Sequence, residues 1–510
     1  MNRPTLIVSL LIVVGTLILM GATYAYFTAT ATSNEQVVES GTLQLTYHTG
    51  QDITLDNVFP SEESEAGIHQ FSVENTGSLD ATYYLYLTNI TLQKDGEDTQ
   101  SSNLKWKLYS ANESYGTSEE IASGDFGERN NTIELDTDVE ITSGTKQYYV
   151  LKVWLQETGS VQNWDQGLDF SAQVEATTEK KNITKTLVGT MKEEAVMDNI
   201  ASTYVTSSTG IDFSQISSDT NGKGLYILNS TVNDQYPIMY YRGAVENNNV
   251  KFANFCWKIV RTTETGGVKL IYNGQPDNNG QCTNKTGAST MLPISNQAFN
   301  DQNNDNTYVG YMYGSSNSNS YEDTHQNTNN SNIKTVIDEW YSQNLVTATN
   351  KLEDTVWCND RSIAQDDDYP GTGIGTEITA YSAMYRLSIN SSPSLNCINE
   401  NDRFTVSEKN GNGDLTYPIA LLTADEIAYA GAVYKNNNTS YYLYNNDNFW
   451  TLSPNSFVGN RTNAFDVNAN GSFNGNTVIN PYGVRPAISL KAGTTAISGD
   501  GTATNPYVIE

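Results

Sequence analysis

Residues suited to zinc chemistry are scarce in this chain, which holds three histidines: His48, His69 and His325. A zinc peptidase needs two or three histidines or carboxylates around one ion, usually as His-Glu-x-x-His on a helix. No pair of the three has that spacing, and His325 lies in an Asn-rich stretch. We therefore expect solvated or structural histidines rather than a zinc site.

The four cysteines all lie beyond residue 250, and none of them forms a Cys-x-x-Cys pair. This spacing argues against a zinc ribbon or a redox centre. In an exported protein, an even number of cysteines favours structural disulfides. Proximity in the sequence suggests two bridges, Cys256–Cys282 and Cys358–Cys397, which is one of three possible pairings. Four free buried thiols are the alternative.

One turn has part of the pattern of a calcium-binding loop. Asp466, Asn468 and Asn470 place oxygen ligands at alternate positions before Gly471, as in the first half of an EF-hand. The twelfth position is Thr477, which lacks the bidentate carboxylate that such a loop requires. A β-hairpin turn built on the Asn-Gly pair explains the same residues. We expect no cofactor, with calcium at this turn left open.

Three further features have a functional and a structural interpretation. Residues 366–368, three aspartates, form either a solvated acidic loop or a weak cation site. Phe449 and Trp450 form either a ligand platform or part of the core. Arg485, in an otherwise apolar strand, is interpreted as a buried arginine paired with a carboxylate or with backbone carbonyls. The sequence contains no nucleophile elbow, Walker loop or dinucleotide fingerprint. We therefore expect a non-enzymatic protein.

The charge of the chain limits its partners. It has 28 basic and 58 acidic residues, a formal net charge of −30. Such a surface repels nucleic acid phosphates and anionic lipid headgroups. We therefore expect no nucleic-acid partner, and membrane contact only through an uncleaved N-terminal segment.

The N-terminal segment is nearly unbroken apolar sequence from residue 6 to residue 20 and ends in small residues. This pattern at the start of a chain is more typical of an export signal than of a permanent anchor. Both interpretations place the rest of the chain outside the cell.

Four short motifs follow in order: residues 21–27 (Gly-Ala-Thr-Tyr-Ala-Tyr-Phe), 40–45, 71–79 and 170–176. Together they resemble the camelysin/TasA family, bacterial matrix proteins released by a SipW-type signal peptidase. The resemblance implies a jelly-roll sandwich, a cut between Ala25 and Tyr26, and assembly by exchange of an N-terminal strand. It also raises a metallopeptidase activity as an alternative, which the spacing of the histidines does not support.

The region after the proposed cut has the pattern of an antiparallel β-sandwich with short Gly/Asn/Asp turns. The runs at residues 83–87 and 148–155 are the most apolar and are expected to be central. At its start, Phe27, Ala29 and Ala31 alternate with threonines, as in a strand with one apolar face. We expect this arm either to complete the sandwich of the next copy, giving a head-to-tail polymer, or to fold back into its own.

The C-terminal part is predicted to be an α+β module. Residues 333–345 have apolar residues at helical spacing, and Thr423 with Glu426 has the spacing of a helix capping box. The Asn/Ser/Asp-rich stretch 301–332 is expected to be a long exposed insertion. The predicted domains are a signal peptide (1–25), a sandwich (26–178), a linker with a short helix (179–223) and the module (224–510).

Two motifs of the module, residues 449–454 (Phe-Trp-Thr-Leu-Ser-Pro) and 482–488 (Tyr-Gly-Val-Arg-Pro-Ala-Ile), carry a second resemblance. They are similar to a module that recurs in exported proteins of Gram-positive bacteria, and to the C-type-lectin-like/formylglycine-generating-enzyme superfold. The resemblance implies a display or binding module. The sequence as a whole predicts a secreted, non-enzymatic surface or biofilm-matrix protein, which assembles with itself or with other matrix proteins. A monomeric adhesin that binds glycan or protein is the alternative.

Overall fold

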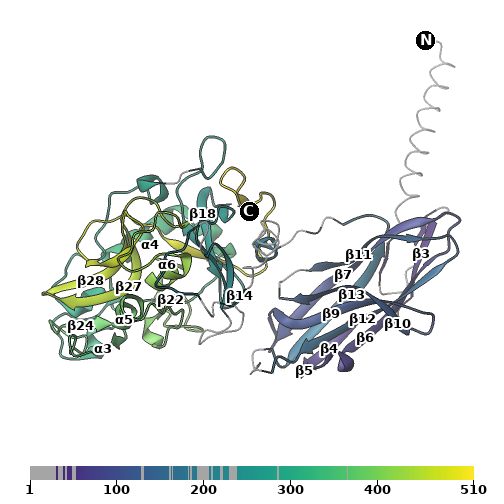
Figure 1. Cartoon of the computed structure of the whole chain (residues 1–510), viewed down its shortest axis with the longest axis horizontal. Helices are drawn as coiled ribbons and strands as arrows, with labels where there is room; N and C mark the ends of the chain where they lie inside the picture. The colour runs from purple at the N-terminus through teal and green to yellow at the C-terminus, as the bar shows by residue number, and fades with distance from the viewer. Residues whose placement is uncertain are drawn as a thin grey trace, which may run out of the picture. The chain divides into compact units, whose positions relative to one another are not determined.

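The computed structural model describes residues 53–510 with internal gaps and, ahead of them, the backbone of three strands. The gaps are 128–130, 160–161, 163–164, 182, 184–185, 192–205, 208–210, 219–221, 229–237, 284–285 and 365. Two compact units follow one another along the chain, Met1–Thr184 and Lys185–Glu510 (Figure 1). The expected class, an antiparallel β-sandwich followed by an α+β module, is confirmed.

The first unit consists of two antiparallel sheets packed around one hydrophobic core. The first sheet has the order β1-β13-β7-β11, with β4 also on β13 and β8 on β7. Its strands are β1 (Thr30–Thr32), β4 (Ile53–Val58), β7 (Ala81–Lys94), β8 (Glu97–Asp98), β11 (Thr132–Ile141) and β13 (Leu168–Thr177). Strand β7 is central in this sheet, as the sequence predicts. Its inward side chains Tyr83, Leu85 and Leu87 are fully buried.

The second sheet has the order β10-β9-β12-β6-β3-β2, with β5 in parallel on β12. Its strands are β2 (Val38–Ser40), β3 (Leu43–His48), β5 (Pro60–Ser61), β6 (Gly67–Asn75), β9 (Ser101–Ala111), β10 (Thr117–Phe126) and β12 (Lys146–Gln156). The short 3-10 helix η1 (Glu63–Glu65) joins β5 to β6. Strand β12 is central, as expected. The jelly-roll topology that the resemblance implies stays a prediction.

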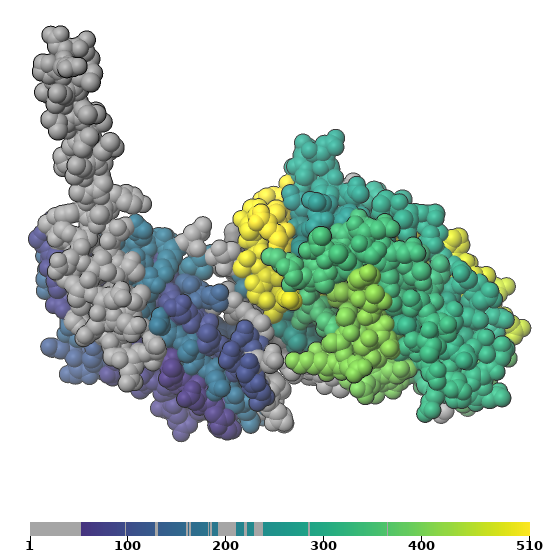
Figure 2. Space-filling model, turned by 180° about the vertical axis from the view of Figure 1, so that it is seen from behind, coloured from purple at the N-terminus to yellow at the C-terminus, as the bar shows by residue number. Residues whose placement is uncertain are grey.

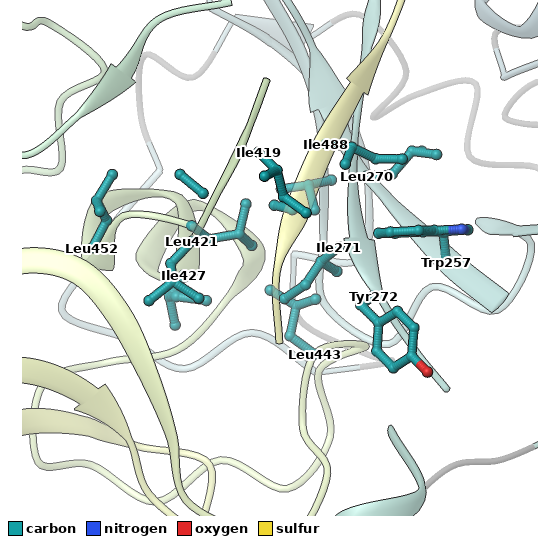
Figure 3. Close-up of a cluster of buried hydrophobic side chains, with 14 of the residues drawn as sticks. Trp257, Leu270, Ile271, Tyr272, Ile419, Leu421, Ile427, Leu443, Leu452 and Ile488 are labelled. Carbon is teal, nitrogen blue, oxygen red and sulfur yellow. The ribbon is translucent and has the colours of Figure 1, made fainter. Parts of the chain in front are cut away.

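The second unit contains a nine-stranded sheet of order β14-β15-β16-β18-β19-β30-β26, to which β17 and β31 add. Its strands are β14 (Thr206–Ser207), β15 (Gly224–Leu228), β16 (Ile238–Arg242), β17 (Asn249–Phe252), β18 (Phe255–Thr262), β19 (Val268–Tyr272), β26 (Ile419–Ala420), β30 (Ala487–Leu490) and β31 (Tyr507–Ile509). Side chains from β18, β19 and β30 pack with those of the segments that carry Leu421, Leu443 and Leu452 (Figure 3). The core therefore joins segments far apart in the sequence. At the surface, residues near the C-terminus (yellow) lie against teal residues in Figure 2, and strand β31 pairs with β17.

A second sheet of this unit has the order β23-β24-β27-β28-β29. Its strands are β23 (Ile363–Ala364), β24 (Thr379–Tyr381), β27 (Phe449–Val458), β28 (Arg461–Val467) and β29 (Phe473–Thr477). Two small ladders pair β20 (Met312–Tyr313) with β21 (Asn329–Asn330), and β22 (Trp357–Cys358) with β25 (Arg403–Phe404).

The helices of the unit are α3 (Tyr321–Thr324), α4 (Asn332–Asn344), α5 (Ser382–Ser388), α6 (Ala424–Ala430) and the 3-10 helices η2 (Gly287–Thr290), η3 (Asn306–Val309), η4 (Val346–Lys351) and η5 (Glu400–Asp402). The predicted helix after residue 332 is confirmed. The predicted capping box of α6 is also present, because Thr423 and Glu426 bond each other's backbone N–H groups.

The short helix predicted in the linker 179–223 is present at residues 187–191, where Leu187 and Met191 are buried in the core of the second unit. One sequence prediction needs correction. The stretch 301–332 is not an exposed insertion. It contains η3, α3 and a small ladder, and Asn306 within it is fully buried because its side-chain amide donates to the carbonyls of other loops.

Candidate functional site

The edge of strand β13 is completed by strands from the start of the same chain. Strand β4 pairs with the first half of β13, and β1 pairs with its end. In this register Ala31 lies opposite Ala176, and Thr32 lies opposite Glu175. Ala176 is fully buried in the sandwich core. The backbone of β1 therefore covers an edge whose side chains belong to the core.

The residues predicted for processing and strand exchange fall mostly outside the described part of the chain. This applies to Ala25, Tyr26, Phe27 and Ala29. Ala31 belongs to β1, whose backbone pairs within its own chain. For residues 30–32 the structure thus has the folded-back arrangement, one of the two alternatives that the sequence leaves open.

The negative charge of Glu175, beside this edge, is neutralised by a lysine of the same unit. Lys181 Nζ lies 2.7 Å from Glu175 Oε2. The backbone N–H of Lys181 donates to the hydroxyl of Tyr86, which is fully buried on the neighbouring strand β7. A strand that pairs with the end of β13 therefore meets a neutralised carboxylate.

Both predicted disulfides are present in the second unit. They join Cys256 to Cys282 and Cys358 to Cys397. The first links β18 to a following loop, and the second links β22 to the loop before η5. Sequence proximity was sufficient here because each bridge closes a short segment.

The three histidines are not brought together. His48 lies on β3 and His69 on β6, in the first unit. His325 is buried in the second unit, where its ring packs 4.2 Å from that of Tyr321 and its Nε2 lies 3.0 Å from the Gly373 carbonyl oxygen. Among the described residues, no group of three or more histidines, cysteines or carboxylates is placed to hold a metal ion.

The candidate calcium loop forms the hairpin turn between β28 and β29. Asn468 N–H donates to the Ser472 carbonyl, and the Asn470 side-chain oxygen accepts from the Ser472 N–H. Gly471 has a φ of +79°, and a Cβ there would lie 1.7 Å from the Asn438 carbonyl oxygen, so glycine is required. Asp466 lies on β28 and accepts from Asn476 of β29. The side chains of Asp466, Asn468 and Asn470 thus each hydrogen-bond to other residues of the hairpin.

Asp466 is nevertheless an unusual group. Its side chain is fully buried, and Oδ2 has no hydrogen-bond partner among the described residues. Burial raises the pKa of this carboxyl from its ordinary value to about 7. An aspartate whose pKa is raised in the folded state stabilises the fold when the pH is below its pKa in the unfolded chain. This stabilisation is lost as the pH rises through the folded-state pKa of about 7.

We therefore expect Asp466→Asn to raise the free energy of unfolding of the second unit by about 4 kcal/mol at pH 8 and to change it little at pH 4. The amide carries no charge, and its oxygen can still accept from Asn476. Denaturant unfolding at both pH values checks this expectation. An equal effect at the two pH values would show that the carboxyl does not titrate in this range.

The remaining candidates have structural roles in the second unit. Phe449 and Trp450 are each 1% exposed, so they belong to the core and form no surface platform. Arg485 donates to the carbonyls of Tyr272 and Leu443, as expected for a buried structural arginine. Both carboxylate oxygens of Asp366 accept hydrogen bonds within its own loop and from Tyr385. Of residues 366–368, for which the sequence leaves a solvated acidic loop or a weak cation site open, Asp366 is thus bonded within the protein.

Sequence reasoning missed two clusters of charged side chains that bring distant residues together. They are Glu63 with Lys107 and Lys152 in the first unit, and Glu426 with Arg261 and Lys269 in the second. The capping box draws attention to Glu426 in the sequence, but no local pattern identifies the partners of either carboxylate.

Comparison with known families gives two matches, each to a part of the chain. Residues 7–111 match the family described as camelysin metallo-endopeptidase. Residues 396–492 match a family described as a domain of unknown function, DUF6273. The first match supports the camelysin-like assignment for the start of the chain. No curated protein matches the chain. Among the described residues, no helix has the length and apolar character needed to cross a membrane.

Solved structures resemble parts of the chain at low scores. The family 32 CBM from C. perfringens NanJ in complex with galactose is 14% identical, covers 29% of this chain and 93% of its own, and has a TM-score of 0.13. The Salmonella enterica trimeric lipoprotein SadB is 9% identical, covers 36% of this chain and 77% of its own, and has a TM-score of 0.13. The infectious bursal disease virus VP2 subviral particle is 14% identical, covers 27% of this chain and 33% of its own, and has a TM-score of 0.16. Scores this low carry no argument about fold or ligand.

Proposed function

We propose that this chain is a secreted, non-enzymatic surface or matrix protein that assembles by exchanging its N-terminal strand between copies. The observation that carries the proposal is the pairing of β1 with the end of β13. The match of residues 7–111 to the camelysin family and the two disulfides, which favour an oxidising compartment outside the cytosol, support it.

The pairing has the features that allow exchange at small cost. Strand β1 makes a three-residue ladder, from Thr30 to Thr32, at one edge of its sheet. If β1 leaves, the end of β13 presents unpaired backbone groups beside the buried Ala176. The same segment of another copy restores identical hydrogen bonds there, so exchange needs no new interface chemistry. Because donor strand and acceptor edge differ, the contact is head-to-tail and can propagate.

The experiment uses exported mature protein, whose N-terminus we expect at Tyr26, and electron microscopy at increasing concentration. Wild-type protein should form filaments, and Phe27→Asp should abolish them because it places a charge on the apolar side of the donor strand. Thr28→Asp is the matched control, because the alternation places Thr28 on the opposite face.

Mature protein that stays monomeric at high concentration, or Phe27→Asp protein that polymerises as well as wild type, would contradict strand exchange. The monomeric adhesin then becomes the better description. An N-terminus at Met1 on a membrane-bound product would instead indicate an anchored protein.

A further inference from the structure

The outer face of the sheet β10-β9-β12-β6 carries a concentration of lysines in a chain with 28 basic and 58 acidic residues. They are Lys105 and Lys107 on β9, and Lys146 and Lys152 on β12. Lys107 and Lys152 are direct cross-strand partners. Like charges placed opposite each other destabilise a sheet, so this pair needs an anion between its ammonium groups.

Glu63 supplies the anion that both ammonium groups share, while Glu120 of β10 pairs with Lys107 alone, at 3.1 Å. Its Oε2 lies 3.0 Å from Lys107 Nζ, and its Oε1 lies 3.1 Å from Lys152 Nζ. The hydroxyl of Tyr109 donates to Oε1 at 2.7 Å. The bond from Tyr109 and the two ammonium groups lower the pKa of Glu63 to about 2. Lys107, Tyr109 and Lys152 thus form a preorganised receptor for one carboxylate, here called the lysine cradle.

The loop that brings Glu63 to the cradle is only lightly attached. Its helix η1 has no buried residue and no side-chain cap. The neighbours Glu62, Ser64 and Glu65 are exposed, and among the described contacts the side-chain bonds from this loop to the sheet are those of Glu63. Between its backbone ladder with β12 at Pro60 and Ser61 and the start of β6, this acidic loop is therefore held on the sheet through the carboxylate of Glu63.

An apolar side chain lies beside the cradle. Ile68, the cross-strand neighbour of Lys152 on β6, is 61% exposed. Recognition surfaces commonly combine an exposed apolar residue with charge-assisted hydrogen bonds, because the apolar contact adds to the binding energy of those bonds.

We propose that the lysine cradle is a binding site for an acidic polypeptide segment of a partner protein, and that Glu63 occupies it as an intramolecular substitute. The carboxylate now in the cradle is a glutamate on a polypeptide loop, so the geometry favours a glutamate-bearing peptide. This site uses a different sheet from the β13 edge and does not depend on strand exchange.

The test measures binding of a synthetic peptide with the chain's own loop sequence, residues 60–67, to the full-length mature protein. Glu63→Gln removes the internal competitor and leaves the cradle intact. We expect this variant to bind the peptide about tenfold or more tightly than wild type, because wild type holds its own glutamate at a high effective concentration. Glu65→Gln, which removes an equal charge at an exposed position of the same loop, should behave as wild type. Binding should weaken as salt is raised.

Equal binding by the Glu63→Gln and Glu65→Gln variants would overturn the proposal, as would unchanged binding when Lys107→Gln is added to Glu63→Gln. Stronger binding of polygalacturonate than of the peptide would reassign the cradle to anionic polysaccharide. Carbodiimide coupling of the peptide to the Glu63→Gln protein gives a second test, because the internal carboxylate can no longer couple to the cradle lysines. Cross-links at Lys107 or Lys152 are expected, and their absence at saturating peptide contradicts the site.

Discussion

Replacing Glu426 by Gln is expected to lower the free energy of unfolding of the second unit by about 3–5 kcal/mol, because it leaves buried cations unpaired. Arg261 Nε lies 2.7 Å from Glu426 Oε1, and Lys269 Nζ lies 3.0 Å from the same oxygen. All three side chains are at most 5% exposed. Burial alone would raise the pKa of Glu426, but the charges of Lys269 and Arg261 outweigh it and lower the pKa to about 2.

Denaturant unfolding followed by circular dichroism, with the transitions of the two units fitted separately, measures this effect. The matched control is Glu264→Gln. Glu264 also pairs with Arg261, at 3.3 Å, but its side chain is 19% exposed and solvent compensates its loss. We expect that control to cost about 1 kcal/mol or less. Equal losses in the two variants would mean that Glu426 does not hold the buried cations.

Glu426 also illustrates what the sequence can reveal and what it cannot. Its place in a capping box follows from the three-residue spacing to Thr423, because helix N-termini need local acceptors. Its ion pair with Arg261 spans 165 residues of sequence and depends on how α6 packs against β16, the strand that pairs with β18 at Arg261. Local chemistry was therefore predictable, and the tertiary role of the same side chain was not.

Some strands can also be predicted from the sequence, and others cannot. Core strands are recognisable from the alternation of apolar and polar residues, as in β9, or from a continuous apolar run, as in β12. Nothing in the sequence predicts strand β10, because it lies at a sheet edge and has almost no apolar period. The Asn-rich stretch 301–332 misled for the opposite reason. Asn306 is fully buried because its amide satisfies backbone carbonyls, and composition does not distinguish such an asparagine from a solvated one.

The candidate sites follow the same logic. Cys256–Cys282 and Cys358–Cys397 were predictable because each pair is close in sequence. The lysine cradle was not, because Lys107 faces Lys152 only through the register of β9 and β12. A one-residue shift of that register would turn one of the two lysines to the other face of the sheet.

The second large effect expected is acid destabilisation through His325. Burial, then the nearby Arg361 cation, lowers the pKa of this imidazole to about 3, although its hydrogen bond with the Gly373 carbonyl acts in the opposite direction. Its Nδ1 has no partner among the described residues. A histidine with a lowered folded-state pKa stabilises the fold above its unfolded value of about 6.5, and that contribution is lost as the pH falls toward 3.

Acidification from pH 7.5 to pH 4 is therefore expected to cost the second unit about 3 kcal/mol through His325 alone. Other carboxyls titrate in the same interval, and Asp466 opposes the loss, so the effect is measured as a difference between two proteins. His325→Gln retains a donor for the Gly373 carbonyl and has no titrating group. Its stability relative to wild type should rise by about 3 kcal/mol between the two pH values, measured by denaturant unfolding.

His69→Gln, in the first unit, should leave the pH dependence of the second unit unchanged. A wild-type and a His325→Gln protein that lose stability in parallel on acidification would show that His325 takes up no proton on unfolding. Carboxyls with a lowered pKa, such as Glu426, would then set the acid limit instead.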